Sequence, residues 1–150
     1  MIRYLVYFCL IWLAGCGRTS PAVLPSTHMQ IAGQDFSLEI ATTPHEQELG
    51  LMHRDYLGPS QGMIFPFADE KKRDFWNHDV HFPLDLIFLD GGGSVVSIKR
   101  LEAFNERDVS SDAPARYAIE LNAGTAQRLH IDVGQHLDIP RDALSPAAGK

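Results

Sequence analysis

The body of this chain lacks cysteine. Both cysteines, Cys9 and Cys16, lie near the N-terminus, and residues 17–150 contain none. A body without thiols cannot form an internal disulfide, use a cysteine nucleophile or bind a metal through thiolates. Neither the H-E-x-x-H pattern of zinc hydrolases nor a P-loop occurs in the sequence. The residues therefore indicate no cofactor, and they favour a function other than catalysis without deciding the question.

An excess of basic residues is also missing. The chain carries 13 Lys and Arg against 19 Asp and Glu, a formal net charge of −6. Nucleic-acid binding needs clustered cations that face phosphates, so we expect no nucleic-acid partner. The run Lys71-Lys72-Arg73 is short and predicts a solvated turn. With 45% hydrophobic and 21% charged residues in a length of 150, the composition is typical of one globular domain.

The longest continuous apolar run of the sequence lies at its start. Residues 4–13 are apolar and follow the positive residue Arg3. As a helix they would span only about 15 Å, half the thickness of a bilayer core. The run therefore predicts the h-region of a signal peptide rather than a transmembrane helix, and we assign residues 1–15 to that peptide.

The next residues, Leu13-Ala14-Gly15-Cys16, resemble the lipobox of bacterial lipoproteins. The resemblance implies that Cys16 receives a diacylglycerol, that cleavage precedes it, and that its new amino end is acylated, for example with palmitate. Several acyl chains anchor a protein stably, because each buried CH₂ contributes about 0.8 kcal/mol. Gly17 stands where Asp commonly signals retention in the inner membrane, so an outer-membrane site facing the periplasm is favoured if the source has two membranes. The alternatives are an ordinary signal peptide or an N-terminal core segment.

The rest of the chain predicts a tether and one domain. Residues 16–27 form the lipidated N-terminus and a flexible tether, since they are rich in Ser, Thr, Pro and Ala. The domain is expected over residues 28–140, with a flexible tail over 141–150. Its short alternating segments and turn signals predict a mainly β fold, a sandwich or a partly open barrel with one or two short helices.

Apolar residues that alternate with polar ones predict the strands, and capping and turn residues predict the helices. Thr43, Pro44 and Glu46 form a capping box that begins a short helix ending near Gly50, and a second helix is expected over 122–130. Pro66 marks its segment as an edge or irregular strand. The expected strands cover residues 30–32, 36–40, 63–67, 75–79, 84–89, 94–101, 117–121 and 136–139.

Four ordered segments resemble the DUF192 family of small bacterial and archaeal domains of unknown function. They are Glu48–Arg54, Gly62–Phe65, Phe75–Asp85 and Ala115–Leu121, and the similarity extends over about residues 36–139. In the third segment Asn77, His78, Asp79 and Val80 replace the Met, Lys, Asn and Thr of the family pattern. The resemblance implies a compact β domain, often exported, and it implies no reaction.

The densest polar and aromatic cluster lies between residues 75 and 85. Trp76 offers a face for stacking, and Asn77, His78 and Asp85 offer hydrogen-bonding groups. Together they predict a site for a polar small molecule or a glycan. The alternative is structural, with Trp76 in the core and Asp85 bound to backbone N–H groups at the neighbouring bend.

Arg54 and Glu120 lie beside apolar residues in two of the four segments. Arg54 could bind a carboxylate or phosphate with two parallel hydrogen bonds. The two residues could equally pair with each other or with the backbone and fix the fold. Both are candidate ligand-binding residues, whereas Met52 and Met63 are expected to fill the core.

Three functions are compatible with these residues. The favoured one is a membrane-anchored envelope lipoprotein whose β domain is a binding or accessory module for a polar ligand or an envelope partner. The second is an enzyme acting on envelope glycans, with Asp85 and Glu120, or a histidine, as acid and base. The third is a metal-binding module made from His78, His81 and Asp85 with Asp79, although the two histidines would lie on opposite faces of a regular strand.

The lipobox leads to a direct test. We expect Cys16→Ser to lose fatty-acid labelling and membrane retention, because serine has no sulfur to receive the diacylglycerol. Metabolic labelling and membrane fractionation measure both properties. Cys9→Ser is the matched control and should behave as wild type, since residue 9 lies in the predicted signal peptide. Equal labelling of Cys16→Ser and wild type would overturn the anchor.

Overall fold

The computed structural model describes residues 24–144. Cys16 and the predicted signal peptide lie outside the described residues. The strands are β1 Ser26–Ile31, β2 Gln34–Ile40, β3 Gln61–Lys71, β4 Asp74–Phe75, β5 Leu84–Leu89, β6 Val95–Leu101, β7 Val109–Ser110 and β8 Ala115–Asn122. The helices are α1 Pro44–Leu49, α2 Thr125–Arg128 and α3 Arg141–Leu144.

Six of the strands form one mixed sheet in the order β1-β2-β3-β8-β5-β6, and β4 pairs only with β7. The pairing of β2 with β3 is parallel, and the chain between them includes α1. The expected mainly β fold is confirmed. The sheet does not close into a barrel, because its outer strands β1 and β6 do not pair with each other. A full sandwich is not formed either, because the second sheet has only two strands.

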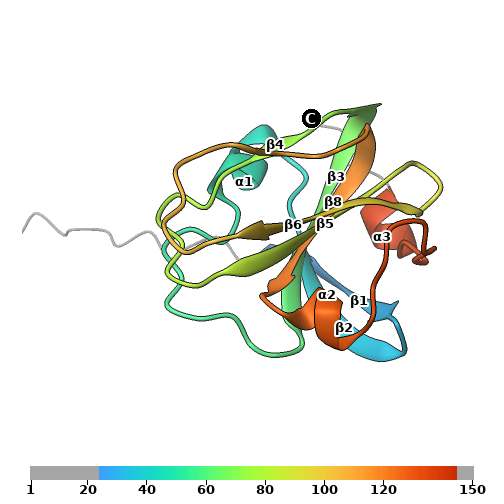
Figure 1. The fold of residues 1–150 in the computed structure, drawn as a ribbon, viewed down its shortest axis with the longest axis horizontal. Helices are drawn as coiled ribbons and strands as arrows, with labels where there is room; N and C mark the ends of the chain where they lie inside the picture. Colours follow the sequence, from blue (N-terminus) through green and yellow to red (C-terminus); the bar gives the residue numbers. More distant parts are fainter. Residues whose placement is uncertain (1–23, 145–150) are drawn as a thin grey trace, which may run out of the picture.

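The first face of the sheet packs against α2 and α3. Its core contains Ile87, Ile119 and Leu121 from the central strands, with Ala126 of α2 and Ala143 of α3. Figure 1 shows α2 on the opposite side of β5 and β6 from α1 and β4. The short helices thus cover this face at two places, and the sheet supplies most of the apolar surface that they bury.

The second face carries a separate core. Met63, Leu86, Phe88 and Ala118 point into it from β3, β5 and β8, and Leu51 covers them from the turn after α1. Because both faces are covered, every residue of β5 is buried. This explains why residues 86–89 of β5 are apolar without a break rather than alternating.

Helix α1 begins as the sequence predicts. The Thr43 hydroxyl accepts a hydrogen bond from the Glu46 N–H at 3.2 Å, and the Glu46 carboxylate accepts from the Thr43 N–H at 2.8 Å. The backbone N–H of Thr43 also lowers the pKa of Glu46, since it stabilises the carboxylate. Pro44 opens the helix and Gly50 ends it. No helix within residues 24–144 combines the length and the apolar character needed to cross a membrane.

Strand β3 is central only in its first half. It pairs with β2 as far as Ile64, whereas its ladder with β8 reaches Pro66 and resumes at Lys71. Pro66, which has no N–H to donate, lies beyond the end of the ladder with β2, and the register with β8 shifts after it. The edge and irregular character that proline predicts is therefore confirmed for this part of β3.

Three segments differ from the expectation. The strand expected at 75–79 stops at Phe75, and Asp79 adopts a φ of 49°, which is incompatible with a strand. The strand expected at 136–139 is reduced to one bridge between His136 and Ser94. Beyond residue 140 the chain forms α3 and buries Ala143, where a weakly ordered tail is expected. These segments depend on tertiary contacts that no local pattern reports.

The turn before β6 generates a stability prediction. Gly93 has a φ of +85°, and a Cβ there would lie 2.5 Å from the Leu137 backbone oxygen. We expect Gly93→Ala to lower the free energy of unfolding through both backbone strain and this clash. Gly33→Ala is the matched control, because Gly33 has a φ of +81° with open space around it. In urea unfolding, Gly93→Ala should cost at least about 1 kcal/mol more than Gly33→Ala, since overpacking typically costs that much. Equal costs would contradict the close packing of this turn.

Candidate functional site

A pocket of about 340 Å³ opens on the second face of the sheet. Phe65 and Phe67 of β3 and Glu120 of β8 line it from the sheet. Met52, after α1, and Phe75 of β4 line it from the segments that cover this face. The pocket therefore lies where the covering segments leave part of the sheet open, between α1 and β4.

Strand alternation places Glu120 on this face. Its neighbours Ile119 and Leu121 point into the first core, so the side chain between them points to the second face. Across the ladders Glu120 is opposite Met63 on β3 and Leu86 on β5. Glu120 is 4% exposed, and its Oε2 has no hydrogen-bond partner. A carboxyl group is thus held between two apolar side chains and away from water.

Burial raises the pKa of Glu120 to about 8, and the nearby positive charge of Arg54 opposes this rise only in part. Arg54 is occupied elsewhere, because its guanidinium donates two hydrogen bonds to Glu39, at 2.5 and 2.7 Å. Glu120 is therefore mostly protonated at neutral pH. The expected direct pairing of Arg54 with Glu120 is not formed, and Arg54 contributes by charge alone.

Asn77 supplies a second unpaired polar atom. Its side-chain nitrogen donates to the Phe82 and Glu102 carbonyl oxygens at 3.1 and 2.8 Å. Because carbonyls only accept, these two bonds determine which end of the amide is nitrogen. The remaining atom, Oδ1, is buried without a partner. Asn77 and Glu120 both line the pocket, and within residues 24–144 they hold the two buried side-chain polar atoms that lack a partner.

The aromatic wall is organised around Phe75. Its ring makes edge-to-face contacts with Phe65, Phe67 and Phe88 at centroid distances of 5.1, 6.3 and 5.5 Å. Arg73 lies 4.0 Å over the Phe67 ring and also bonds Asp69. These contacts fix the rings in place, so the pocket has rigid apolar walls.

The solvated turn expected at residues 71–73 is only partly present, because Arg73 is buried. Its side chain is buried, and its Nε donates to the Ala115 carbonyl at 3.2 Å. Lys71 and Lys72 are exposed, as the sequence predicts. Arg73 therefore has a structural role, because its side chain joins the end of β3 to the start of β8.

Trp76 and His78 stand at the mouth of the pocket. Trp76 is 40% exposed, which contradicts a place in the core. Its ring stacks on His78 with centroids 5.1 Å apart, and His78 lies 3.5 Å from Glu106. One face of the indole is therefore covered by the imidazole. The expected grouping of Trp76, Asn77 and His78 is present in the structure, and it includes Glu120 from a distant strand.

Asp85 lies elsewhere. It is opposite Leu121 on β8, and that residue points into the first core, so Asp85 and Glu120 project from opposite faces of the sheet. The Asp85 carboxylate accepts a hydrogen bond from the Ala126 N–H at 2.8 Å and lies 3.5 Å from Arg100. It holds the start of α2 rather than the expected bend. The pair of carboxylates suggested for a glycosidase therefore does not meet on one face.

The residues suggested for a metal site also separate. His78 faces Glu106, whereas His81 lies 3.5 Å from Asp79. Asp79 in turn bonds His53 at 2.5 Å, and the His53 hydrogen bond lowers the pKa of that carboxyl. No group of three or more His, Cys, Asp or Glu within the described part of the chain could hold a metal ion. The metal hypothesis gains no support from this geometry.

The pentapeptide Gly58-Pro59-Ser60-Gln61-Gly62 has the G-x-S-x-G spacing of a hydrolase nucleophile elbow, a match that the sequence reasoning missed. An elbow needs a strand, a sharp turn and then a helix. Here the serine lies in a turn that leads into strand β3. Its hydroxyl accepts a hydrogen bond from the side chain of Gln34 at 3.3 Å. The spacing therefore occurs without the structure that makes it catalytic.

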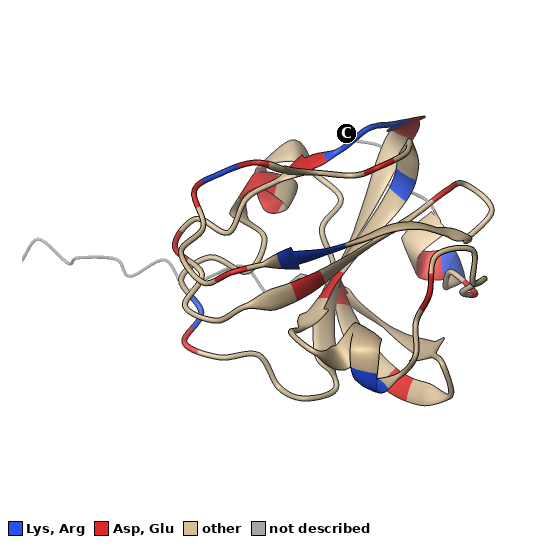
Figure 2. Cartoon of the chain, viewed as in Figure 1, with Lys and Arg blue, Asp and Glu red and all other residues tan. Residues whose placement is uncertain are grey.

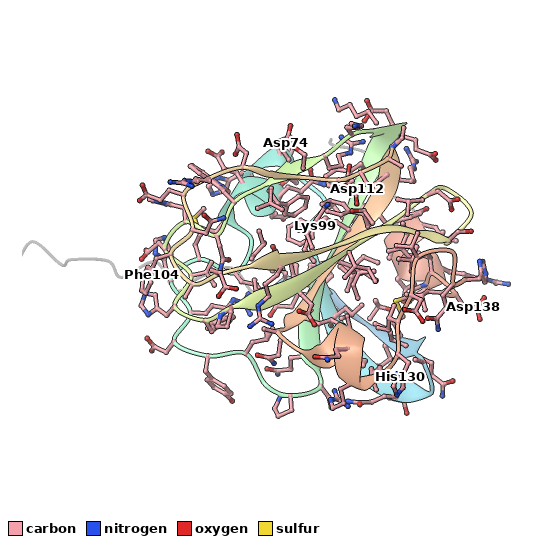
Figure 3. All side chains as sticks on the ribbon, viewed as in Figure 1. Asp74, Lys99, Phe104, Asp112, His130 and Asp138 are labelled. Atoms are coloured by element: carbon pink, nitrogen blue, oxygen red, sulfur yellow. The ribbon has the colours of Figure 1, made fainter. Side chains whose placement is uncertain are left out.

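Charges around the second face are largely paired. Figure 2 shows Lys and Arg interspersed with Asp and Glu over the fold rather than separated onto opposite faces. Lys99, opposite Leu86 on β6, bonds Asp112 at 2.6 Å, and the two side chains lie together in Figure 3. The bond from Lys99 lowers the pKa of Asp112. Around the pocket, charges of both signs are therefore mixed rather than separated.

The family assignment follows from sequence comparison. The model of the DUF192 family, described as "Uncharacterized ACR", matches residues 27–139. The chain belongs to the DUF192 family. This confirms the resemblance seen in the four segments. No curated protein matches the sequence.

Two solved structures share the DUF192 fold of this chain. A protein from Sinorhizobium meliloti 1021, described as a candidate transcription regulator, is 32% identical and has a TM-score of 0.68, with 74% of this chain and 88% of that chain covered. A protein of unknown function from Novosphingobium aromaticivorans DSM 12444 is 30% identical with a TM-score of 0.68, and the match covers 81% of this chain and 94% of that chain. The descriptions of these two proteins name no ligand or reaction that could be compared with the pocket.

The buried carboxyl generates a pH prediction. The folded pKa of Glu120 is about 8, above its ordinary value of 4.5. The folded state favours the protonated form of Glu120. The folding stability that this preference contributes is fully present below about pH 4.5 and is lost as the pH rises through about 8. Between pH 5 and 8, the free energy of unfolding should fall more steeply in wild type than in Glu120→Gln, by up to about 1.4 kcal/mol per pH unit. The 7 histidines are common to both proteins, so their titration cancels in the difference. Equal slopes in urea unfolding would show that Glu120 is not held protonated.

Proposed function

We propose that this chain is a lipid-anchored envelope protein whose DUF192 domain binds a small molecule in the Glu120 pocket. The supporting observation is that the unpaired polar atoms of Glu120 and Asn77 belong to residues that line one pocket. Leaving a buried polar group unpaired costs about 1–3 kcal/mol, so such atoms are rare unless a function retains them. A ligand that bonds both atoms would recover that cost.

The shape of the pocket supports the same function. Pockets for small molecules combine apolar walls with a few polar groups that orient the ligand. Here Phe65, Phe67 and Phe75 supply rigid walls, and Leu49 and Trp76, both partly exposed, give the mouth an apolar lining. The predicted lipid on Cys16 and the tether that follows it would keep this binding module at a membrane, facing the periplasm in a source with two membranes.

Catalysis is supported less well. Asp85 and Glu120 lie on opposite faces of the sheet, and Glu120 has no second carboxylate hydrogen-bonded to it. A formal charge of −6 and the interspersed charges in Figure 2 do not favour binding to phosphates.

A fragment screen tests the binding function. Trp76 is the only tryptophan after residue 15, so its fluorescence in the mature lipoprotein reports on the mouth of the pocket. Fragments that bind should lose at least about tenfold in affinity in Glu120→Leu, which keeps the side-chain volume but removes the hydrogen-bonding head, a loss of about 1.4 kcal/mol.

Asp85→Asn is the matched control for this screen. It changes a carboxylate on the opposite face of the same sheet, and its amide oxygen can still accept from the Ala126 N–H. It should bind fragments as wild type does. A screen in which no fragment binds wild type, or in which every bound fragment binds Glu120→Leu equally well, would overturn the proposed function.

A further inference from the structure

The two unpaired atoms have different hydrogen-bonding roles. The protonated Glu120 carboxyl can donate through its O–H, whereas the Asn77 oxygen can only accept, because both amide hydrogens already bond the Phe82 and Glu102 carbonyls. No hydrogen bond joins the two side chains to each other. A ligand that satisfies both must therefore present an acceptor to Glu120 and a donor to Asn77.

A positively charged head group is disfavoured in this pocket. Arg73 already occupies one face of the Phe67 ring at 4.0 Å, so a second cation cannot bind that face. Beside Glu120 itself, the charge that acts on the carboxyl is the positive one of Arg54. A cation bound at Glu120 would meet that charge, and it would have to expel the proton from Glu120 to gain an ionic partner there.

A negatively charged head group lacks a free cation beside the two unpaired atoms. The guanidinium of Arg54 is held by Glu39 with two hydrogen bonds. That of Arg73 is held by Asp69 and by the Ala115 carbonyl. Burying an anion without an ionic partner costs far more than burying a neutral polar group.

The remaining charged groups at the pocket lie toward its rim and balance one another. Glu48 on α1 and Asp74 on β4 carry negative charge, while Lys71, Lys72 and, when protonated, His78 carry positive charge. On the far side of Leu86, Lys99 is paired with Asp112. Among the described residues around Glu120, Arg54 is therefore the charged group that acts on it.

We infer that the pocket selects an uncharged, largely apolar molecule whose head group both accepts from Glu120 and donates to Asn77, as a primary or secondary amide does. This inference rests on the proposed binding function and names its ligand class. Glycans fit it less well, because their several hydroxyl groups outnumber the two polar atoms available among Phe65, Phe67 and Phe75.

Ligand binding should also depend on the proton of the Glu120 carboxyl. The ligand accepts from the carboxyl O–H, so it binds the protonated form of Glu120 and raises the pKa of that group. The free pocket has a Glu120 pKa of about 8. The affinity should then be nearly constant below pH 7 and fall about tenfold between pH 7 and 9, as the protonated fraction falls.

Three probes of similar size and different charge provide the test. Benzamide is neutral and both donates and accepts, benzylamine is a cation at pH 7, and benzoate is an anion. Methyl N-acetylglucosaminide represents a glycan. With the mature lipoprotein and titration calorimetry at pH 7, benzamide should bind at least about tenfold more tightly than each of the others, since one hydrogen bond to a buried group is worth that factor.

The pH series uses two variants. The benzamide affinity of wild type and of Asp85→Asn should fall about tenfold from pH 7 to 9, as the protonated fraction of a group with a pKa near 8 does. In Glu120→Gln the amide donates at every pH, so its affinity should not change over this range. A wild-type affinity that is independent of pH would overturn the proton-linked donor.

The outcomes separate this inference from the function on which it rests. Tighter binding of benzylamine, benzoate or the glycoside, lost in Glu120→Leu, would overturn the uncharged ligand class while supporting a binding pocket. Absence of binding by all four probes would overturn the inference for amides, and the wider fragment screen would then decide whether the pocket binds any ligand. A structure of wild type with only water at both atoms in the presence of saturating benzamide would likewise overturn the inference.

Discussion

The pairing of β8 between β3 and β5 is the constraint on which the site depends. It places Glu120 opposite Met63 and Leu86 and so determines the face to which the carboxyl points. A register shift of one residue would move Glu120 into the first core, beside α2, and would bring Ile119 and Leu121 to the pocket. The strength of these two ladders therefore matters more for the site than any contact that Glu120 itself makes.

A carboxyl group in such a position is tolerated because its charge is absent at neutral pH. The sheet holds Glu120 among apolar neighbours, and Arg54, the one cation near it, is neutralised by Glu39 on β2. Ionisation of Glu120 at neutral pH would require a free cation beside the carboxyl, and Arg54 is already bonded to Glu39. The fold thus keeps a neutral acid where an apolar residue would be more stable, which is typical of positions retained for binding rather than for folding.

The covering segments complete the site. The turn after α1 and the chain from β4 to residue 80 approach the sheet from two sides, and Asp79 with His53 joins them at the surface. Both residues of that pair have positive φ, as does Phe104, which stands at the edge of the molecule in Figure 3. Unusual backbone conformations therefore gather where these loops meet. Loops held in this way can present polar groups to a ligand while the sheet below stays rigid.

Several elements of the fold could be predicted from the sequence, because the signals for them lie in neighbouring residues. The alternation around Glu120, the apolar run of β5 and the capping box of α1 each correspond to an observed element. Pro66 likewise marks the part of β3 that lies beyond the ladder with β2. The local signals failed for residues 136–139, because a single bridge to Ser94 replaces a ladder there.

The sequence by itself determined the family, the mainly β character of the domain and the grouping of Trp76, Asn77 and His78, since motifs and short periodicities act over neighbouring residues. Only the tertiary structure decided that Glu120 joins this group while Asp85 does not. That outcome depends on which strands pair, in which register and facing which core, and these are contacts between residues far apart in the chain. Burial, which raises the pKa of Glu120, is likewise a property of the assembled sheet and its covering loops.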